Sequence, residues 1–193
     1  GALPDIMEDI RKHYEVTDIY HKTVMTFGIP ESVLAKTIED WEDALPPQMH
    51  LAYLPDPLKG VRLRLSIYGG IKEEQEGYIE KEIDKLKPIL GDALYSCQDD
   101  TLQECIGRML KKHGKTVSAA ESCTGGTISA LFTSIPGSSE FYLGSVTSYA
   151  NSVKTGVLGV DPEIIETFGA VSSECVAEMA EGVRKLTGSD FSV

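Results

Sequence analysis

Ser122 stands in a small-residue turn whose residue types suit nucleophilic chemistry. It belongs to the stretch Ala119–Gly126, which follows a β-leaning segment (115–118) and precedes a segment (127–132) that can continue as a helix. The first turn of a helix has backbone N–H groups without partners and a partial positive charge, and glycines allow a ligand to approach those donors. A hydroxyl held where a strand becomes a helix is well placed to act as a nucleophile. The stretch therefore predicts a nucleophile beside an anion-binding turn.

Each candidate side chain also has a simpler structural interpretation. Ser122 and Thr124 are of the residue types that cap helices, and the pair Gly125 and Gly126 would also allow tight packing between a helix and a strand. A lysine such as Lys154 usually lies in solvent on a helix surface. The remaining candidates suit a strand or a loop: Tyr149, Ser138 and Ser139. Spacing alone favours the structural interpretation for each residue, and no single one of them establishes a chemical role.

Alternating helices and strands in the second half would position these side chains. The pair Asp99 and Asp100 marks a boundary, and Thr101 with Glu104 has the spacing of a capping box. The pattern then predicts a helix from 102 that ends at Gly114, a strand before Ser122 and a helix after it. It continues with a strand over 143–149, helices that start near 151, 161 and 172, and a strand from 189. Alternation of this kind predicts a three-layer α/β fold with helices covering a sheet.

The first half predicts a small α/β module with the order β-α-β-β-α-β. Strands are expected at 19–27, 49–54, 61–68 and 93–97, helices at 30–41 and 72–90, and a loop at 55–60. Such modules bind RNA when they carry a GXXG loop and basic flanks, but this one has no GXXG and its helices are acidic. We therefore interpret it as a spacer or interface domain, with Arg62 and Arg64 on an exposed strand face.

Composition narrows the class of protein. The 193 residues suffice for one large or two small domains, and no apolar run approaches the ~20 residues of a membrane helix, so we expect a soluble, cytoplasmic protein. The net charge is −12, and residues 1–100 hold 11 basic against 20 acidic side chains, so nucleic-acid binding is disfavoured. The four cysteines show no CxxC pair and the four histidines no ligand spacing, which favours buried reduced thiols over disulfides and predicts no metal site.

Four strings of the second half resemble one known family when they are taken together. AESCTGG, IPGSSEFYLG, SYANSVKTGVLGV and FGAVSSECVAEMAEGVR are similar to the C-terminal domain of the CinA family, named for competence and DNA damage. The family includes the PncC enzymes, which deamidate nicotinamide mononucleotide. Residues 19–98, with the string HKTVMTFGIPES, resemble the KH-like middle module of the longer CinA proteins. The resemblance implies an α/β fold: a CinA C-terminal-type domain over 99–193 after a KH-like module over 19–98.

The chain departs from the family pattern at both ends. Longer CinA proteins begin with a molybdopterin-cofactor-binding-like domain linked to ADP-ribose pyrophosphatase activity, and residues 1–18 resemble only the last helix of that domain. The family's C-terminal domain also continues to a Gly-rich segment of the GIAGP type that helps form the nucleotide site, whereas this chain stops at Val193. The resemblance thus implies a fragment with a truncated C-terminal domain and an incomplete active site.

The resemblance also implies a reaction. The family converts nicotinamide mononucleotide and water to nicotinate mononucleotide and ammonia, and amide hydrolysis needs an activated nucleophile and donors for the oxyanion. By resemblance Ser122 is the nucleophile, Lys154 its general base and Tyr149 a proton relay or support for the lysine, with no metal and no cofactor. Ser139 is the second candidate for the nucleophile. Residues implied to bind substrate or shape the turn are Glu121, Cys123, Thr124, Gly125, Gly126, Ser139 and Asn151.

Two other functions compete with the deamidase. A family member could keep the fold and bind a nucleotide without turnover, as a scaffold linked to competence or DNA damage. Nucleic-acid binding through the KH-like module is a third reading, and the net charge of −9 in residues 1–100 argues against it. The partners implied are nicotinamide mononucleotide and a second copy of the chain, because family members are usually homodimers.

Overall fold

The computed structural model describes residues 2–14, 18–56 and 60–193. The chain divides into two compact units, Gly1–Leu102 and Gln103–Val193, which we describe separately. None of the helices among the described residues is long and apolar enough to span a membrane.

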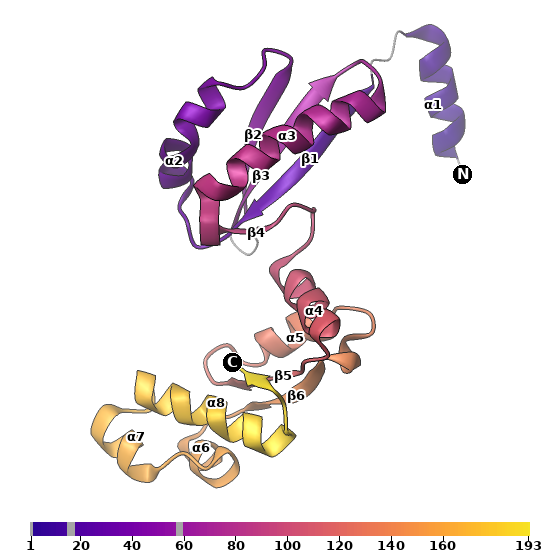
Figure 1. Ribbon diagram of the computed structural model, residues 1–193. Coiled ribbons are helices and arrows are strands. Elements are labelled where there is room, and N and C mark those ends of the chain that lie inside the picture. Colours follow the sequence, from indigo (N-terminus) through magenta and orange to yellow (C-terminus); the bar gives the residue numbers. More distant parts are fainter. Residues whose placement is uncertain (1, 15–17, 57–59) are drawn as a thin grey trace. The chain divides into compact units, whose positions relative to one another are not determined.

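The first unit contains a four-stranded sheet covered on one face by two helices (Figure 1). A helix, α1 (Ala2–His13), comes before it. The unit then consists of β1 (Ile19–Thr26), α2 (Glu31–Asp43), β2 (Met49–Asp56), β3 (Gly60–Tyr68), α3 (Lys72–Leu90), the 3-10 turn η1 (Gly91–Ala93) and β4 (Leu94–Ser96). The strand order is β2-β3-β1-β4, and every pair is antiparallel. The predicted order of elements is confirmed.

Strand β3 explains why helices cover only one face of this sheet. Its apolar residues Val61, Leu63, Leu65 and Ile67 are buried in one core with residues of α2 and α3, as alternation predicts. Arg64 is exposed on the opposite face, whereas Arg62 is partly buried and pairs with Asp99. The loop predicted at 55–60 is too long, because β2 continues through Asp56, which pairs with Gly60; residues 57–59 lie outside the described residues.

The second unit has three layers, as predicted for an α/β fold. It consists of α4 (Leu102–His113), β5 (Val117–Glu121), α5 (Thr127–Thr133), the 3-10 turn η2 (Ser138–Glu140), β6 (Tyr142–Thr147), α6 (Asn151–Leu158), α7 (Pro162–Phe168), α8 (Ser173–Thr187) and β7 (Phe191–Ser192). The three strands are parallel in the order β6-β5-β7. Helices lie on both sides of this sheet (Figure 1).

The two faces of β5 belong to two different cores. Val117 and Ala119 pack with Phe132, Phe141 and Tyr142 and with side chains of α4 and α5. Ala120 packs on the other side with residues of α6, α7 and α8. Because β5 is the central strand and all five of its residues are buried, its carboxyl end is held in place from both faces.

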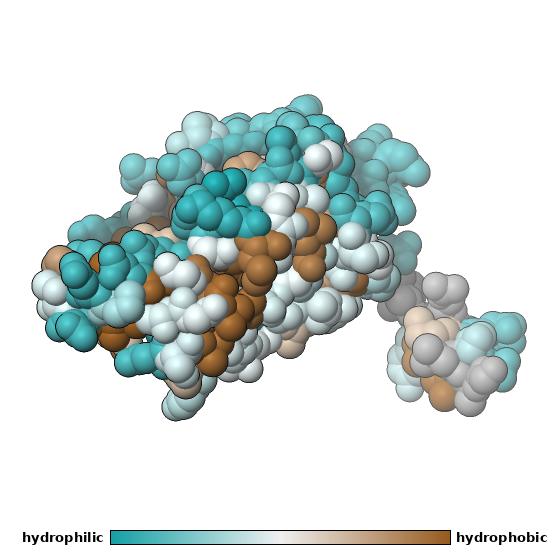
Figure 2. Space-filling view, turned by 90° about the horizontal axis from the view of Figure 1, so that it is seen from below, coloured by the Kyte–Doolittle hydropathy of each residue, from teal (hydrophilic) through white to brown (hydrophobic). Residues whose placement is uncertain are grey.

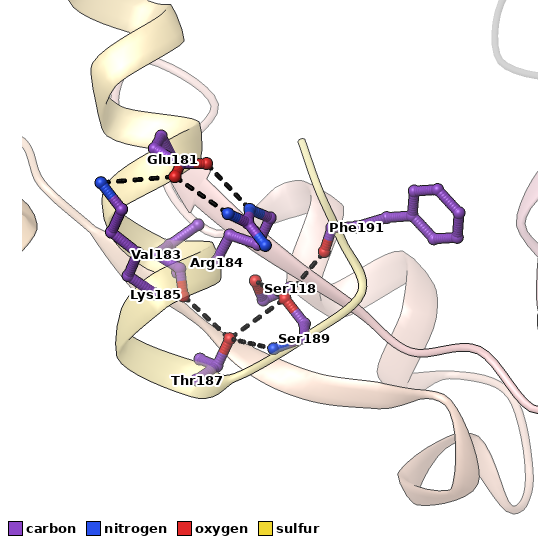
Figure 3. A network of polar contacts seen from close by, with 8 residues as sticks. All are labelled: Ser118, Glu181, Val183, Arg184, Lys185, Thr187, Ser189 and Phe191. Atoms are coloured by element: carbon purple, nitrogen blue, oxygen red, sulfur yellow. Dashed lines mark hydrogen bonds and ion pairs between the residues drawn. The ribbon is translucent and has the colours of Figure 1, made fainter.

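A hydroxyl network joins β5 to the C-terminal strand (Figure 3). The Oγ atoms of Ser118 and Ser189 lie 2.8 Å apart, and the Ser189 hydroxyl donates to the carbonyl of Phe191. Thr187, at the end of α8, contacts the Ser189 hydroxyl at 3.2 Å. These hydroxyls satisfy one another inside the unit, so β7 is fixed beside β5 although it has only two residues.

Some local predictions need correction. Helices start near residues 151, 161 and 172, as predicted. Asp161 and Ser172 cap α7 and α8, whereas the cap position of α6 belongs to Ala150 and Asn151 is its first residue. All four cysteines are free, as predicted. Cys105 and Cys175 are buried, whereas Cys123 is exposed because it lies in the turn after β5. The surface carries apolar side chains among polar ones (Figure 2), and Phe168, Val171 and Val176 are exposed.

Candidate active site

Ser122 and Lys154 form a hydrogen-bonded pair at the carboxyl end of β5. The Lys154 Nζ lies 3.0 Å from the Ser122 Oγ. Ser122 follows the last residue of the central strand, and Lys154 lies on α6, which follows the neighbouring strand β6. The carboxyl ends of parallel strands meet at one edge of a sheet, so this topology brings together two residues that are 32 positions apart.

Lys154 is buried, which excludes the solvated-lysine interpretation. Its side chain is 1% exposed, and Leu158, one turn later on the same face of α6, is 4% exposed. The Nζ also donates a short hydrogen bond to the backbone carbonyl of Ser148. Among the described residues, no carboxylate pairs with this amine. The lysine is thus desolvated and directed at one hydroxyl and one carbonyl.

Glu121 occupies the N-terminus of α5. Its carboxylate accepts hydrogen bonds from the backbone N–H groups of Gly126, Ile128 and Ser129 at 3.0, 3.1 and 2.9 Å. Burial raises the pKa of this carboxyl, but the three N–H bonds and one from the Thr124 hydroxyl outweigh burial and hold the pKa below its ordinary value. Because the side chain is 1% exposed and fully engaged, the structure does not support Glu121 as a substrate ligand.

This arrangement corrects the expected roles of the turn. The cap position of α5 is Gly126, which makes no side-chain cap, so neither Ser122 nor Thr124 caps the helix. Gly125 and Gly126 adopt the left-handed conformation, with φ of 61° and 97°, which lets the chain reverse tightly after the strand. Since Glu121 takes the first-turn donors of α5, the expected anion site at that helix end is already filled by the protein's own carboxylate.

Two backbone donors of the turn stay available. The Gly125 N–H donates to the Ser122 carbonyl at 3.1 Å, and the Thr127 N–H donates to the Thr124 carbonyl at 3.0 Å. The N–H groups of Cys123 and Thr124 have no acceptor within the described parts of the chain. They directly follow Ser122, so they are the donors that could receive a developing oxyanion beside that hydroxyl.

A cavity of about 550 Å³ opens beside Ser122. Its apolar wall includes Ile128, Val171, Val176 and Met179. The other lining residues are small, polar or at the chain end: Ala120, Ser122, Cys123, Thr124, Ala170, Ser172, Ser173 and Val193. None of the described residues that line it has a charged side chain, so the cavity suits a flat, largely apolar group that carries a reactive carbonyl.

The structure does not bring every predicted residue to the pair. The Tyr149 side chain is 79% exposed and makes no hydrogen bond to Lys154 or to any other described residue. Ser139 lies in η2 before β6, at the sheet edge opposite Ser122, roughly 15–20 Å away across the length of the strand. Asn151 lies on the correct edge and is exposed. Cys123 and Thr124 line the cavity, while Gly125 and Gly126 shape the turn.

Sequence reasoning missed Ser148 and the far wall of the cavity. Ser148 is fully buried and links Glu121 to Lys154, but a serine at the end of a strand carries no distinguishing pattern. Val171 and Val176 lie in the string FGAVSSECVAEM, on which the family resemblance was based. Nothing in that string predicts that the two valines line a cavity. The described residues contain no group of histidine, cysteine and acidic side chains that could hold a metal ion.

The second unit belongs to the class of three-layer α/β proteins with a parallel sheet. A serine and a buried lysine meet at the carboxyl end of its central strand. Two family models match the chain: the CinA C-terminal domain over residues 99–193 and the KH domain of damage-inducible protein CinA over residues 21–96. The chain belongs to the CinA family, which confirms the resemblance seen in the sequence.

Relatives agree with this assignment. The chain is 42% identical over 194 residues to a CinA-like protein of Cytophaga hutchinsonii, and 40% identical over 190 residues to one of Flavobacterium psychrophilum. These alignments cover 100% and 98% of this chain but only 46% and 45% of the relatives, so the chain spans about half their length. The crystal structure of competence damage-inducible protein A (ComA) from Klebsiella pneumoniae is 34% identical, with a TM-score of 0.47 over 47% of this chain and 56% of that one.

Proposed function

We propose that the second unit is an amidohydrolase that converts nicotinamide mononucleotide and water to nicotinate mononucleotide and ammonia. The observation that carries the proposal is the 3.0 Å contact between the Ser122 hydroxyl and the buried Lys154 amine, beside a cavity of about 550 Å³. The choice of substrate comes from the family resemblance, and the apolar wall of the cavity is compatible with a flat carboxamide-bearing ring.

The first half-reaction transfers the acyl group to the enzyme. The Ser122 Oγ attacks the carboxamide carbon while its proton passes to the Lys154 Nζ. The Ser148 carbonyl accepts one N–H of the amine. In the uncharged amine, the nitrogen lone pair can then accept the Ser122 proton. The oxyanion is received by the N–H groups of Cys123 and Thr124. The C–N bond then breaks, Lys154 returns the proton to the leaving nitrogen, and ammonia departs from an ester on Ser122.

The second half-reaction uses the same groups. Lys154 takes a proton from water, the resulting hydroxide attacks the ester carbon, and the same two N–H groups receive the oxyanion. Collapse breaks the bond to the Ser122 Oγ, which takes the proton back from Lys154. The carboxylic acid product leaves and gives its proton to water. Lys154 must be uncharged at the start of each half-reaction in order to accept a proton.

The test compares two lysine variants by ammonia release from nicotinamide mononucleotide. Lys154→Met removes the base and keeps the length of the side chain, so we expect the rate to fall by about 10²–10⁴-fold. Lys112→Met is the matched control, because Lys112 is exposed and should leave the rate unchanged. Ammonia release by Lys154→Met at the rate of the control would refute the Ser–Lys mechanism.

Calorimetric titration separates catalysis from the competing role. Binding of nicotinamide mononucleotide by the unsubstituted chain without any release of ammonia would contradict the proposal and favour a nucleotide-binding scaffold. Release of ammonia that depends on Lys154 would support the deamidase.

A further inference from the structure

The two members of the candidate pair come from separate parts of the chain. Ser122 ends the β5 segment, whereas Lys154 lies on α6, and 32 positions separate them. A hydrogen-bond distance between such residues requires that both segments be fixed to a common support. Glu121 is hydrogen-bonded to both segments. Its side chain bonds to the N-terminus of α5, and its backbone carbonyl bonds to Ser148, which contacts Lys154.

The side chain of Glu121 fixes the nucleophile side. Its two carboxylate oxygens accept the N–H groups of Gly126, Ile128 and Ser129, so they hold the first turn of α5 against the end of β5. Ser122 is the next residue along the chain and begins the turn between those two elements. An ionised carboxylate suits this position because it has only acceptor sites, whereas an amide would direct its own N–H₂ group at backbone donors.

The backbone carbonyl of Glu121 fixes the lysine side. It accepts the Ser148 N–H at 2.7 Å and contacts the Ser148 hydroxyl at 3.3 Å. The carbonyl of Ser148 in turn accepts the Lys154 Nζ. All three residues are at least 99% buried, so water does not compete for these bonds.

We propose that Glu121 is a positioning residue, which holds Ser122 and Lys154 within hydrogen-bond distance by tying α5 with its carboxylate and Ser148 with its carbonyl. The inference rests on the proposed function only in requiring a reactive Ser–Lys pair, and not on the identity of the substrate. A residue that merely stabilised the short helix α5 would change unfolding but would leave the reactivity of Ser122 in the folded protein unaltered.

The experiment measures Ser122 reactivity with a fluorophosphonate probe, followed by mass spectrometry of the labelled peptide. In this reaction the Ser122 Oγ bonds to phosphorus, fluoride leaves, and the serine proton passes to Lys154. Rates are compared at a temperature where circular dichroism shows each variant folded. The variants are Glu121→Gln, Glu121→Asp and, as the control, Glu166→Gln, because Glu166 is an exposed glutamate of α7.

We expect Glu121→Gln to slow labelling by about 10²-fold, which is the effect of a displacement on the order of 1 Å at a reacting pair. Glu121→Asp keeps the charge but is one methylene shorter, so it should recover part of the rate, and Glu166→Gln should match the unsubstituted chain. Folded Glu121→Gln that reacts at the unsubstituted rate would overturn the inference. Labelling of the unsubstituted chain no faster than Lys154→Met would also overturn it, because no activated serine would then exist to be positioned.

A measurement on the unsubstituted chain covers the case in which Glu121→Gln does not fold. The amide protons of Gly126, Ile128 and Ser129 should shift together in NMR spectra as one acid group titrates below pH 4.5, the ordinary value for a glutamate. Independent behaviour of the three amides would overturn the inference. Probe labelling of Ser122 without ammonia release from nicotinamide mononucleotide would refute the proposed function and leave the positioning role supported.

Discussion

Replacement of Gly182 by alanine should disturb the candidate site from a distance. Gly182 lies on α8, and a Cβ added there would be 2.0 Å from the backbone carbonyl oxygen of Leu158, the last residue of α6. Ordinary contact begins at 3.4 Å, so the two helices must separate by about 1 Å or more, and backbone cannot move aside as a flexible side chain would. Because α6 carries Lys154, the same displacement would lengthen its 3.0 Å contact with Ser122 beyond hydrogen-bond range.

The expected magnitudes follow from this geometry. Overpacking costs about 1–3 kcal/mol of unfolding free energy, and the gain in helix propensity returns up to about 1 kcal/mol, so we expect a net loss of about 1–2 kcal/mol. A misplacement on the order of 1 Å should lower the rate of ammonia release by about 10²-fold. Urea unfolding measures the first effect, and the ammonia assay measures the second.

Gly156→Ala is the matched control. Gly156 lies on α6 itself, and a Cβ added there meets nothing within 4 Å. The substitution should therefore stabilise the chain by roughly 0.5–1 kcal/mol and leave the rate unchanged. Equal stability and equal activity of the Gly182→Ala and Gly156→Ala variants would refute the claim that close packing of α8 on α6 sets the position of Lys154.

Three further predictions test other parts of the second unit. Hydrogen bonds from Lys115 and Thr116 lower the pKa of Asp190 to about 2 from its ordinary 3.8, so its stabilising effect is complete above about pH 4 and is lost as the pH falls through 2. Asp190→Asn should therefore lower the urea midpoint at pH 7, and this difference should shrink as the pH falls from 4 through 2. Val176→Trp should fill the cavity and raise the KM for nicotinamide mononucleotide at least about 10-fold. The urea midpoint should not change, because Val176 is 55% exposed. An unchanged KM would place the substrate elsewhere. Iodoacetamide should alkylate the exposed Cys123 before the buried cysteines and block the cavity, and Cys123→Ser should prevent that inhibition. Equal inhibition of both proteins would show that alkylation of Cys123 does not block the site.

Local pattern was sufficient to predict the elements. The alternation in Val61–Ile67 predicts a half-buried strand, and Ser172 before a periodic apolar run predicts a capped helix; both are present. Such predictions succeed because periodicity and capping depend on residues that are near one another in the sequence.

Pairing between distant residues was harder to predict. Spacing alone favours a solvated Lys154 and a capping Ser122, and only the parallel order β6-β5-β7 brings both to one edge of the sheet. The same topology separates Ser139 from that edge, because the residue lies before β6 and not after it.

The sequence left the role of Glu121 open between binding substrate and shaping the turn, for a related reason. The sequence shows a strand followed by a turn with two glycines, and it predicts free donors at the helix that follows. It does not show that the last side chain of the strand folds over to fill those donors. The cavity wall formed by Val171 and Val176 was also not predicted. Both valines are exposed, and scattered apolar residues on a surface are common, so their presence in the sequence does not indicate a cavity.

Ammonia release from nicotinamide mononucleotide by the unsubstituted chain and by Ser122→Ala, measured side by side, tests the central claim most directly. The account predicts that the unsubstituted chain releases ammonia and that Ser122→Ala, which keeps the fold and the cavity but loses the attacking oxygen, is at least about 10³-fold slower. Equal rates for the two proteins would contradict the assignment of Ser122 as the nucleophile.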